Sequence, residues 1–197
     1  MFAEVLDCRI LLISGSLRIG STNSATVRTA ASVIVAGVST EIFEGMGELP
    51  HFNPDDDIEA LHPAVTHLRT RLAAADAVLF CTPEYAGALP GSFKNLLDWT
   101  VGGGTYDKSV AWINASAGSG AVDAHASLRT VLERTGTDIV DAACAHIPVT
   151  RQAVGTDGVI EEAVIRGRIE DVLGALAERV RERRAARVAQ KVATTVV

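Results

Sequence analysis

The sequence predicts an α/β protein with a doubly wound, five-stranded parallel sheet and helices on both faces. Short apolar runs alternate with segments of helical periodicity along the chain, as in proteins built from repeated strand–helix units. The run Ala77–Cys81 is apolar without a break, which is typical of a strand buried on both faces in a parallel sheet. The crossovers should be right-handed, and sheets of this kind bind ligands beyond the carboxyl ends of the strands, where the strand order reverses.

Five short segments predict the strands, and the first of them is an apolar run too short for a lone helix. They are Ile10–Ile13, Val38–Phe43, Asp76–Cys81, Ser109–Asn114 and a fifth within Asp138–Pro148. Between them apolar residues recur every three or four positions, which indicates helices that bury one face. We predict five helices. The first runs from after Asn23 to near Gly37, the second begins near Pro63, the third spans Pro90 to Trp99, the fourth runs from Ala121 to Gly136, and the last begins near Glu161. Glycine suits the position after a helix, and proline suits a first turn.

The composition predicts one domain over residues 1–197, with a last helix over about 161–190 and a flexible tail over 191–197. Hydrophobic residues make up 48% of the chain, enough for a sizeable core. The formal net charge of −6 argues against nucleic-acid binding. No apolar stretch reaches the roughly 18 residues of a membrane span, so we expect no membrane association.

Cysteine usage and the first residues predict a cytoplasmic location. Cys8, Cys81 and Cys144 are too far apart for a disulfide framework or a CxxC metal site, which favours a reducing compartment. Met1–Asp7 holds no signal segment. Cys81 is expected to be a core residue, with a redox role as the alternative.

The loop after the first strand has the composition of a phosphate site. It supplies hydroxyls, a guanidinium and an amide from Ser16, Arg18, Ser21, Thr22 and Asn23. The helix that follows would present free backbone N–H groups to an anion. Neither a Walker A motif nor Gly-x-Gly-x-x-Gly is present, so a mononucleotide phosphate fits better than ATP or a dinucleotide. The alternative is a capped strand–helix turn without a ligand.

The loop after the third strand, Thr82–Gly91, has the composition of a site for a flat ring. Prolines stiffen both of its ends, and Gly87 allows a planar group to approach the backbone. Tyr85 offers an aromatic face and a hydroxyl, with packing or a dimer contact as the alternative. A third small-residue loop, Ala115–Gly120, follows the fourth strand, and we predict that all three loops converge on one ligand.

Two motifs carry a resemblance to a known family. They are Gly15-Ser16-Leu17-Arg18-x-x-Ser21-x-Asn23 and Pro83-Glu84-Tyr85-x-Gly87-x-x-Pro90-Gly91-x-x-Lys94-Asn95-x-x-Asp98-Trp99. In this order they resemble the NAD(P)H-dependent FMN reductases, a family with the flavodoxin-like fold that includes flavin, quinone, azo-dye and chromate reductases. The resemblance covers about Ile10 to Leu132.

The resemblance implies an FMN site in the three loops. The phosphate would lie at Ser16, Arg18, Ser21 and Asn23, where Thr22 offers a further hydroxyl. The isoalloxazine ring would lie against Pro83, Glu84, Tyr85, the backbone N–H of Ala86, and Gly87, with Ser116, Ala117 and Gly118 as a third wall. The chain departs from the family pattern where Ala86 replaces a common Asn and Ala88 a common Ser.

The implied activity is hydride transfer from NADPH or NADH to the flavin, which then reduces a small acceptor. The acceptor would be a flavin, a quinone, an azo compound or a chromate-like oxyanion. FMN carries this chemistry, so no catalytic side chain is expected, and the five scattered histidines are read as surface or structural residues. The resemblance also implies a homodimer or homotetramer, with Glu84, Tyr85 and the helix from Pro90 as candidate interface residues. The alternatives are a flavodoxin-like electron carrier and a non-catalytic phosphate-binding protein.

Three further patterns have structural explanations. Asp55–Asp57 lacks the ligand spacing of a calcium loop, so a solvated turn is expected rather than a metal site. The cations from Arg181 to Lys191 suit a helix C-terminus, with a nucleic-acid-binding tail as the alternative. Asn95 and Asp98 are expected to hold the loop Thr82–Gly91 (the ring loop) in place, while Trp99 packs into the core.

Overall fold

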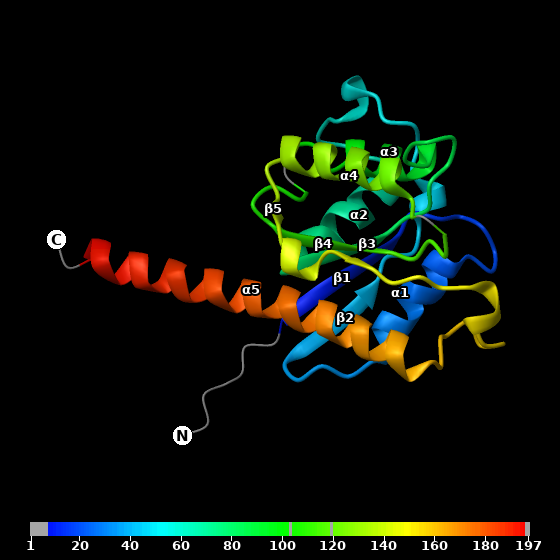
Figure 1. The fold of residues 1–197 in the computed structure, drawn as a ribbon. Coiled ribbons are helices and arrows are strands. Elements are labelled where there is room, and N and C mark those ends of the chain that lie inside the picture. Colours follow the sequence, from blue (N-terminus) through cyan, green and yellow to red (C-terminus); the bar gives the residue numbers. More distant parts are fainter. Residues whose placement is uncertain (1–7, 103, 119, 196–197) are drawn as a thin grey trace.

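The computed structural model describes residues 8–102, 104–118 and 120–195, and a parallel sheet with helices on both faces forms its centre (Figure 1). The strands are β1 (Cys8–Ser14), β2 (Val38–Ile42), β3 (Ala77–Cys81), β4 (Ser109–Asn114), β5 (Asp138–Ile139) and β6 (Ala145–His146). The helices are α1 (Thr22–Ser32), α2 (Pro63–Ala74), α3 (Gly91–Asp98), α4 (Val122–Arg134) and α5 (Ala163–Thr195). The predicted α/β fold class is confirmed.

The position of β1 in the sheet determines where a ligand can bind. The strand order is β2-β1-β3-β4-β5, and β1 pairs in parallel with both β2 and β3. The chain winds outward in one direction to β2 and in the other to β3. Sheets of this kind bind ligands beyond the carboxyl ends of the strands at this point of reversal.

The fifth strand differs from the prediction. The short strands β5 and β6 both pair with β4, and a 3-10 turn at Asp141–Ala143 separates them. Aspartate and alanine have lower strand propensity than the β-branched residues of the other runs, so the pairing breaks there and resumes at Ala145.

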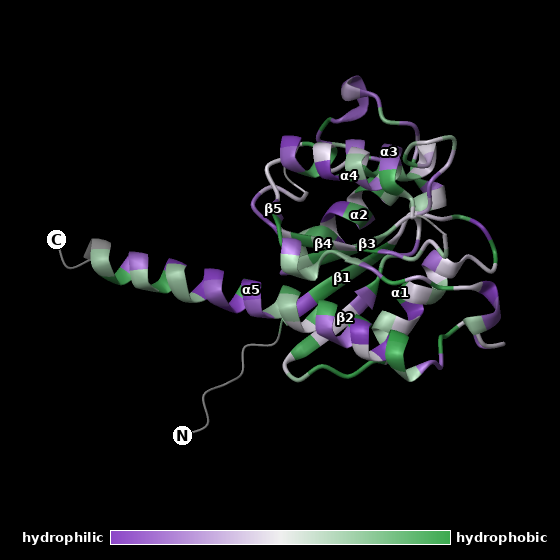
Figure 2. Ribbon diagram, viewed as in Figure 1, coloured by the Kyte–Doolittle hydropathy of each residue, from purple (hydrophilic) through white to green (hydrophobic). Residues whose placement is uncertain are grey.

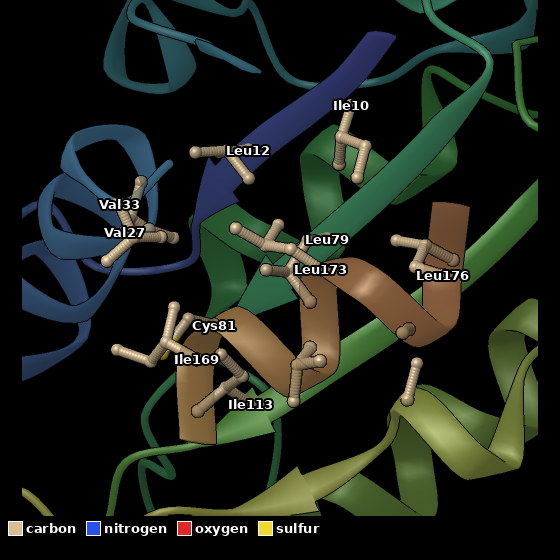
Figure 3. Packing of buried hydrophobic residues seen from close by; sticks show 14 of the residues in the cluster. Ile10, Leu12, Val27, Val33, Leu79, Cys81, Ile113, Ile169, Leu173 and Leu176 are labelled. Atoms are coloured by element: carbon tan, nitrogen blue, oxygen red, sulfur yellow. The ribbon is translucent and has the colours of Figure 1, made fainter. Parts of the chain in front are cut away.

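Two apolar clusters attach the helices to the sheet. On one face, α1 and α5 pack against the strands through residues that include Val27, Ile169 and Leu173, which contact the side of the sheet that bears Leu12 and Leu79 (Figure 3). On the other face, α2, α3 and α4 contribute Leu68, Phe93 and Leu128. Figure 2 shows the consequence, with apolar strands inside and hydrophilic residues on the outward faces of the helices.

Two helix ends differ from the prediction. α1 ends at Ser32 rather than near Gly37, because the β-branched residues that begin at Val33 favour the extended backbone that Val33 adopts. α5 continues to Thr195 instead of ending near residue 190. Alanine, arginine, glutamine and lysine favour helix, and no glycine or proline follows Gly174. Part of the predicted flexible tail is therefore helical, and residues 196–197 lie outside the described residues.

The Asn95 side chain binds the segment before α2 rather than the ring loop, which corrects the role predicted for it. The Asn95 side chain accepts a hydrogen bond from the Phe52 N–H at 2.7 Å and donates to the Pro50 carbonyl at 2.9 Å. Trp99 is buried, as predicted, and its Nε1 donates to the same carbonyl at 2.8 Å. Asp98 pairs with Lys94 on the same helix at 2.6 Å.

Ion pairs hold α5 against the edge of the sheet opposite the carboxyl ends of the strands. Asp138 accepts hydrogen bonds from Arg179 at 2.9 and 3.0 Å and from Ser109 at 2.8 Å, and Arg183 lies 3.1 Å away. Arg183 and Arg187 also pair with Asp107. The hydrogen bonds from Arg179 lower the pKa of Asp138 to about 2. These cations of the C-terminal segment therefore have partners within the fold.

Asp138→Asn is expected to lower the free energy of unfolding by about 1–2 kcal/mol at pH 7, because it weakens charge-assisted bonds to two arginines. Since the pKa of Asp138 is lower in the folded than in the unfolded chain, its contribution is complete above about pH 4 and is lost as the pH falls toward 2. Urea unfolding of both proteins at pH 7 and pH 2.5 measures the difference, which is expected to shrink at the lower pH.

The matched control is Asp55→Asn, which changes an exposed carboxylate and is expected to alter the stability by less than about 0.5 kcal/mol. An Asp138→Asn variant as stable as the unmodified chain at pH 7 would contradict the role assigned to this cluster.

Candidate functional site

A cavity of about 710 Å³ lies at the carboxyl ends of the strands. The loops after β1, β3 and β4 line it, as does a fourth segment that follows β6. Its volume is in the range of small-molecule sites, about 300–1,000 Å³. The three loops that the sequence predicts to converge therefore do meet at one cavity.

Most of the predicted site residues line this cavity. They are Ser16, Arg18, Ser21, Thr22, Asn23, Pro83, Glu84, Tyr85, Ser116 and Ala117. Ala86, Gly87 and Gly118 belong to the same loops but are not among the lining residues. Thr82, Ala115 and Gly120 also line the cavity and lie in the predicted loops without having been named as site residues, whereas Ala121 and the segment 149–152 were missed. No motif marks this last segment, and only its place next to β4 in the fold brings it to the site.

The N-terminus of α1 opens into the cavity with polar groups available to a ligand. Ser21 occupies the N-cap position, but its side chain makes no capping hydrogen bond. A turn that served only to cap the helix would use this hydroxyl. Arg18 is exposed, and its Nη2 donates to the Gly20 carbonyl at 3.3 Å. The free hydroxyl, the guanidinium and the backbone N–H groups of the first turn together suit an anion.

Cys81 is a buried residue that positions Asn23. Its thiol donates to the Asn23 Oδ1 at 3.3 Å, so the Asn23 amide nitrogen can donate to a ligand in the cavity. Burial raises the pKa of the Cys81 thiol to about 12. A thiol of this kind stays protonated at neutral pH and is a poor nucleophile. The prediction of a core residue is confirmed, since Cys81 is 1% exposed.

Gly15 allows the loops after β1 and β3 to touch. A Cβ at this residue would lie 2.3 Å from Thr82 Oγ1 and 2.9 Å from the Phe93 ring, so no side chain fits. The Gly15 N–H donates to the Cys81 carbonyl at 2.8 Å, which extends the pairing of β1 and β3 into the loops. The loop between β1 and α1 (residues 15–21, the phosphate loop) and the ring loop therefore both begin at this contact.

The ring loop contains a tight two-residue turn. The Tyr85 N–H donates to the Ala88 carbonyl at 3.0 Å, and the Ala88 N–H donates to the Tyr85 carbonyl at 3.1 Å. Between them, Ala86 and Gly87 have φ values of 52° and 70°. Positive φ at both corner residues is the hallmark of a type I′ turn, which favours Asn-Gly. Ala86 thus occupies a left-handed conformation that is unfavourable for alanine.

Glu84 ties the ring loop to α4. Its Oε2 accepts a hydrogen bond from the Ala124 N–H at 3.0 Å. Ala121, at the N-cap position of α4, has no side-chain oxygen, so Glu84 caps this helix from another loop. A carboxylate at a helix N-terminus is also stabilised by the helix dipole. Two walls of the cavity are therefore joined through one side chain.

Polar side chains support the wall after β4 on the side away from the cavity. The Ser116 N–H donates to Asn114 Oδ1 at 3.1 Å, and the Ser116 carbonyl lies 2.8 Å from His146 Nε2. His125 is buried next to Ala121, with its Nδ1 2.7 Å from the Ala121 carbonyl. Burial lowers the pKa of His125, so its imidazole is neutral at neutral pH.

Residues 8–102, 104–118 and 120–195 contain neither a metal-binding cluster nor a membrane-spanning helix. These residues contain no group of histidine, cysteine, aspartate or glutamate side chains arranged to hold a metal ion. The Asp55–Asp57 run lies at a 3-10 turn over Pro54–Asp56, and Asp57 pairs with Arg69 at 2.8 Å. Among the helices described, none combines the length and apolar character of a membrane span.

Similarity to known proteins agrees with this geometry. The family model for NADPH-dependent FMN reductases matches residues 8–149. The NAD(P)H-dependent FMN reductase PA1204 of Pseudomonas aeruginosa is 43% identical over 93 residues, which cover 47% of this chain and 50% of that protein. The chain thus spans about half the length of this relative. A quinone reductase of Pseudomonas putida is 31% identical over 144 residues, 71% of this chain and 74% of that one.

Solved structures share the fold. FerB, a flavoenzyme NAD(P)H:(acceptor) oxidoreductase from Paracoccus denitrificans, has a TM-score of 0.74 at 28% identity and covers 87% of this chain and 98% of its own. A flavodoxin from the domain Archaea has a TM-score of 0.56 at 11% identity, over 86% of this chain and 99% of its own. The predicted flavodoxin-like fold is confirmed. With its matched segment extending over all three predicted loops, this chain belongs to the NADPH-dependent FMN reductase family.

Proposed function

We propose that this chain is an NAD(P)H-dependent FMN reductase that passes electrons from NADPH or NADH, through bound FMN, to a small-molecule acceptor. The observation that carries the proposal is the convergence of the phosphate loop, the ring loop and the loop after β4 on one cavity. Membership of the family supports FMN as the group that fills it.

The α1 end of the cavity suits the FMN phosphate. Ser16, Ser21 and Thr22 offer hydroxyls, Asn23 offers an amide, and Arg18 offers a permanent positive charge. Backbone N–H groups of the first turn of α1 add donors that need no side chain. These groups would hold a phosphate by hydrogen bonds and charge without a metal ion.

The other end of the cavity suits a flat ring. Pro83, Glu84 and Tyr85 form one wall, and Ser116 and Ala117 lie on the wall after β4. Bound FMN would supply the hydride chemistry, since its N5 accepts a hydride from a nicotinamide. The chain's own part is to orient the ring and leave one face accessible. Tyr85 lines the cavity and is 52% exposed, so its ring is available both to the flavin and to a neighbouring subunit.

The acceptor and the assembly extend this proposal. Quinone reductase is the name of one relative, so a quinone is the first acceptor to test, followed by a flavin, an azo compound and a chromate-like oxyanion. We also propose a homodimer or homotetramer, in which the exposed Tyr85 and Val122 at the edge of the ring loop and α4 would be covered. Free thiols at Cys81 and Cys144 are compatible with a cytoplasmic location.

The purified chain mixed with FMN is expected to show bound-flavin absorbance that bleaches on anaerobic addition of NADPH or NADH. The nucleotide that bleaches it faster is the donor. Acceptors are then compared by how fast each restores the absorbance. Bound flavin that neither nucleotide reduces would favour an electron carrier, and a chain that binds no FMN would overturn the proposed site.

Arg18→Ala is expected to weaken FMN binding by about 10- to 100-fold, because a charge-assisted contact with the phosphate is lost. Quenching of flavin fluorescence on titration with the apoprotein measures the dissociation constant. Arg134→Ala is the matched control, since it removes an exposed arginine from α4 that does not line the cavity. Equal FMN affinities in the two variants would contradict the phosphate position.

Ala86→Asn is expected to raise the free energy of unfolding of the apoprotein by about 0.5–1 kcal/mol, because asparagine tolerates the left-handed conformation that Ala86 adopts. Urea unfolding measures the change. Ala88→Ser is the control, since it restores the other residue common in the family without relieving a positive φ. Its effect should stay within about 0.5 kcal/mol. A larger gain from Ala88→Ser than from Ala86→Asn would show that backbone strain is not the cause.

A further inference from the structure

The cavity carries a second arginine that no motif predicts. Among the described residues that line it, the charged side chains are Arg18, Arg151 and Glu84. Glu84 is bonded to the N-terminus of α4, so its charge is partly satisfied. The chain as a whole has a net charge of −6, yet this cavity holds two guanidinium groups. An excess of positive charge in a cavity favours an anionic ligand.

Arg151 lies on the same face of the sheet as α1. Its segment is joined to the end of β4, where the Val149 N–H donates to the Ala115 carbonyl at 3.1 Å. Farther along, the Ile160 N–H donates to Thr29 Oγ1 on α1 at 3.0 Å. Val149 and Ile160 belong to the apolar cluster that contains α1, not to the one that contains α3 and α4. This places Arg151 on the side of the cavity where α1 begins.

Further contacts fix the path of the chain beyond Arg151. Arg28 of α1 donates through Nε to the Gly158 carbonyl at 3.1 Å, and Val154 and Ile160 form an antiparallel bridge. The hairpin between η4 (Arg151–Ala153) and α5 is thus bonded along α1. In Figure 1, the loop that precedes α1 and the segment that precedes α5 lie at the same end of the molecule.

The Arg151 guanidinium is available to a ligand. Arg151 is exposed, and within residues 8–102, 104–118 and 120–195 it makes no hydrogen bond or ion pair through its side chain. Many arginines elsewhere in the fold are engaged, as Arg69 is with Asp57 and Arg179 with Asp138, whereas Arg134 on α4 is exposed and, like Arg151, makes no such bond within the described residues. A free guanidinium that lines a cavity has no structural partner to explain its position.

We propose that Arg151 is a second cation for the 5′-phosphate of bound FMN, opposite Arg18. A phosphate monoester carries about −1.5 to −2 charges at pH 7, so one guanidinium does not neutralise it. The fork of a second arginine would supply the remaining charge and two further donors. The inference rests on the proposed function. It also extends the site beyond residues 8–149, the segment that the family model matches.

The test compares FMN with riboflavin, which has the same ring and ribityl chain but no phosphate. Dissociation constants are measured by fluorescence quenching for the unmodified apoprotein, Arg151→Ala, Arg151→Lys and the control Arg134→Ala. Arg151→Ala is expected to weaken FMN binding about tenfold and to leave riboflavin binding unchanged. The FMN affinity of Arg151→Lys should lie between those of the unmodified apoprotein and Arg151→Ala, because lysine keeps the charge and loses the forked donor geometry. The FMN effect should also shrink at high salt.

Three results would overturn this inference. In each of them, FMN binding by the unmodified chain would still support the proposed function. The first is an unchanged FMN affinity in Arg151→Ala. The second is an equal loss for FMN and riboflavin, which would place Arg151 against the ring or the ribityl chain. The third is a raised KM for the nucleotide donor with unchanged flavin affinity, which would assign Arg151 to the donor. Failure of the unmodified chain to bind FMN would overturn both proposals.

Discussion

The contact between Gly15 and Thr82 is the constraint on which the cavity depends. Because residue 15 has no side chain, the loops after β1 and β3 approach to a distance that any Cβ would prevent. The hydrogen bond from Gly15 to the Cys81 carbonyl holds this approach, and the Cys81 thiol in turn holds the Asn23 side chain at the start of α1. Backbone, thiol and amide thus form a continuous link between two loops far apart in sequence. A phosphate and a ring joined by a short chain would need this fixed spacing between their two subsites.

The ring loop is held differently at its base and at its tip. Glu84 joins the ring loop to α4 by a charge-assisted hydrogen bond, which the helix dipole reinforces. The turn at the tip of the same loop is less favourable, since Ala86 holds a backbone conformation that suits asparagine or glycine. The loop therefore combines a firmly held base with a strained tip. Strain of this kind persists where the surrounding structure imposes it, and it is often found at binding sites.

The sequence allowed the fold and much of the site to be predicted, because both leave local patterns. Unbroken apolar runs marked the buried strands, and loops rich in small and polar residues marked three walls of the cavity. What escaped prediction depends on contacts between distant residues. Gly15 belongs to a recognisable motif, but its reason for being glycine is Thr82 and not a ligand. Arg151 follows no motif, and it reaches the cavity only because β6 pairs with β4 and the next hairpin is bonded to α1. The interrupted fifth strand and the early end of α1 were missed because neighbouring residues weakened each pattern.

The direction of α5 determines which side of the molecule faces outward when the protein is linked through this helix to a surface or a carrier. The helix runs back along the sheet from the carboxyl ends of the strands, and the cluster around Asp138 and Asp107 clamps it at the opposite edge (Figure 1). Beyond that clamp the last turns project away from the body (Figure 1), whereas the cavity lies at the other end of the sheet, at the carboxyl ends of the strands. β1 also begins at this edge, with Cys8. A protein immobilised on an electrode or fused to a carrier through its C-terminal helix would therefore present its cavity outward, with the helix itself serving as a rigid spacer.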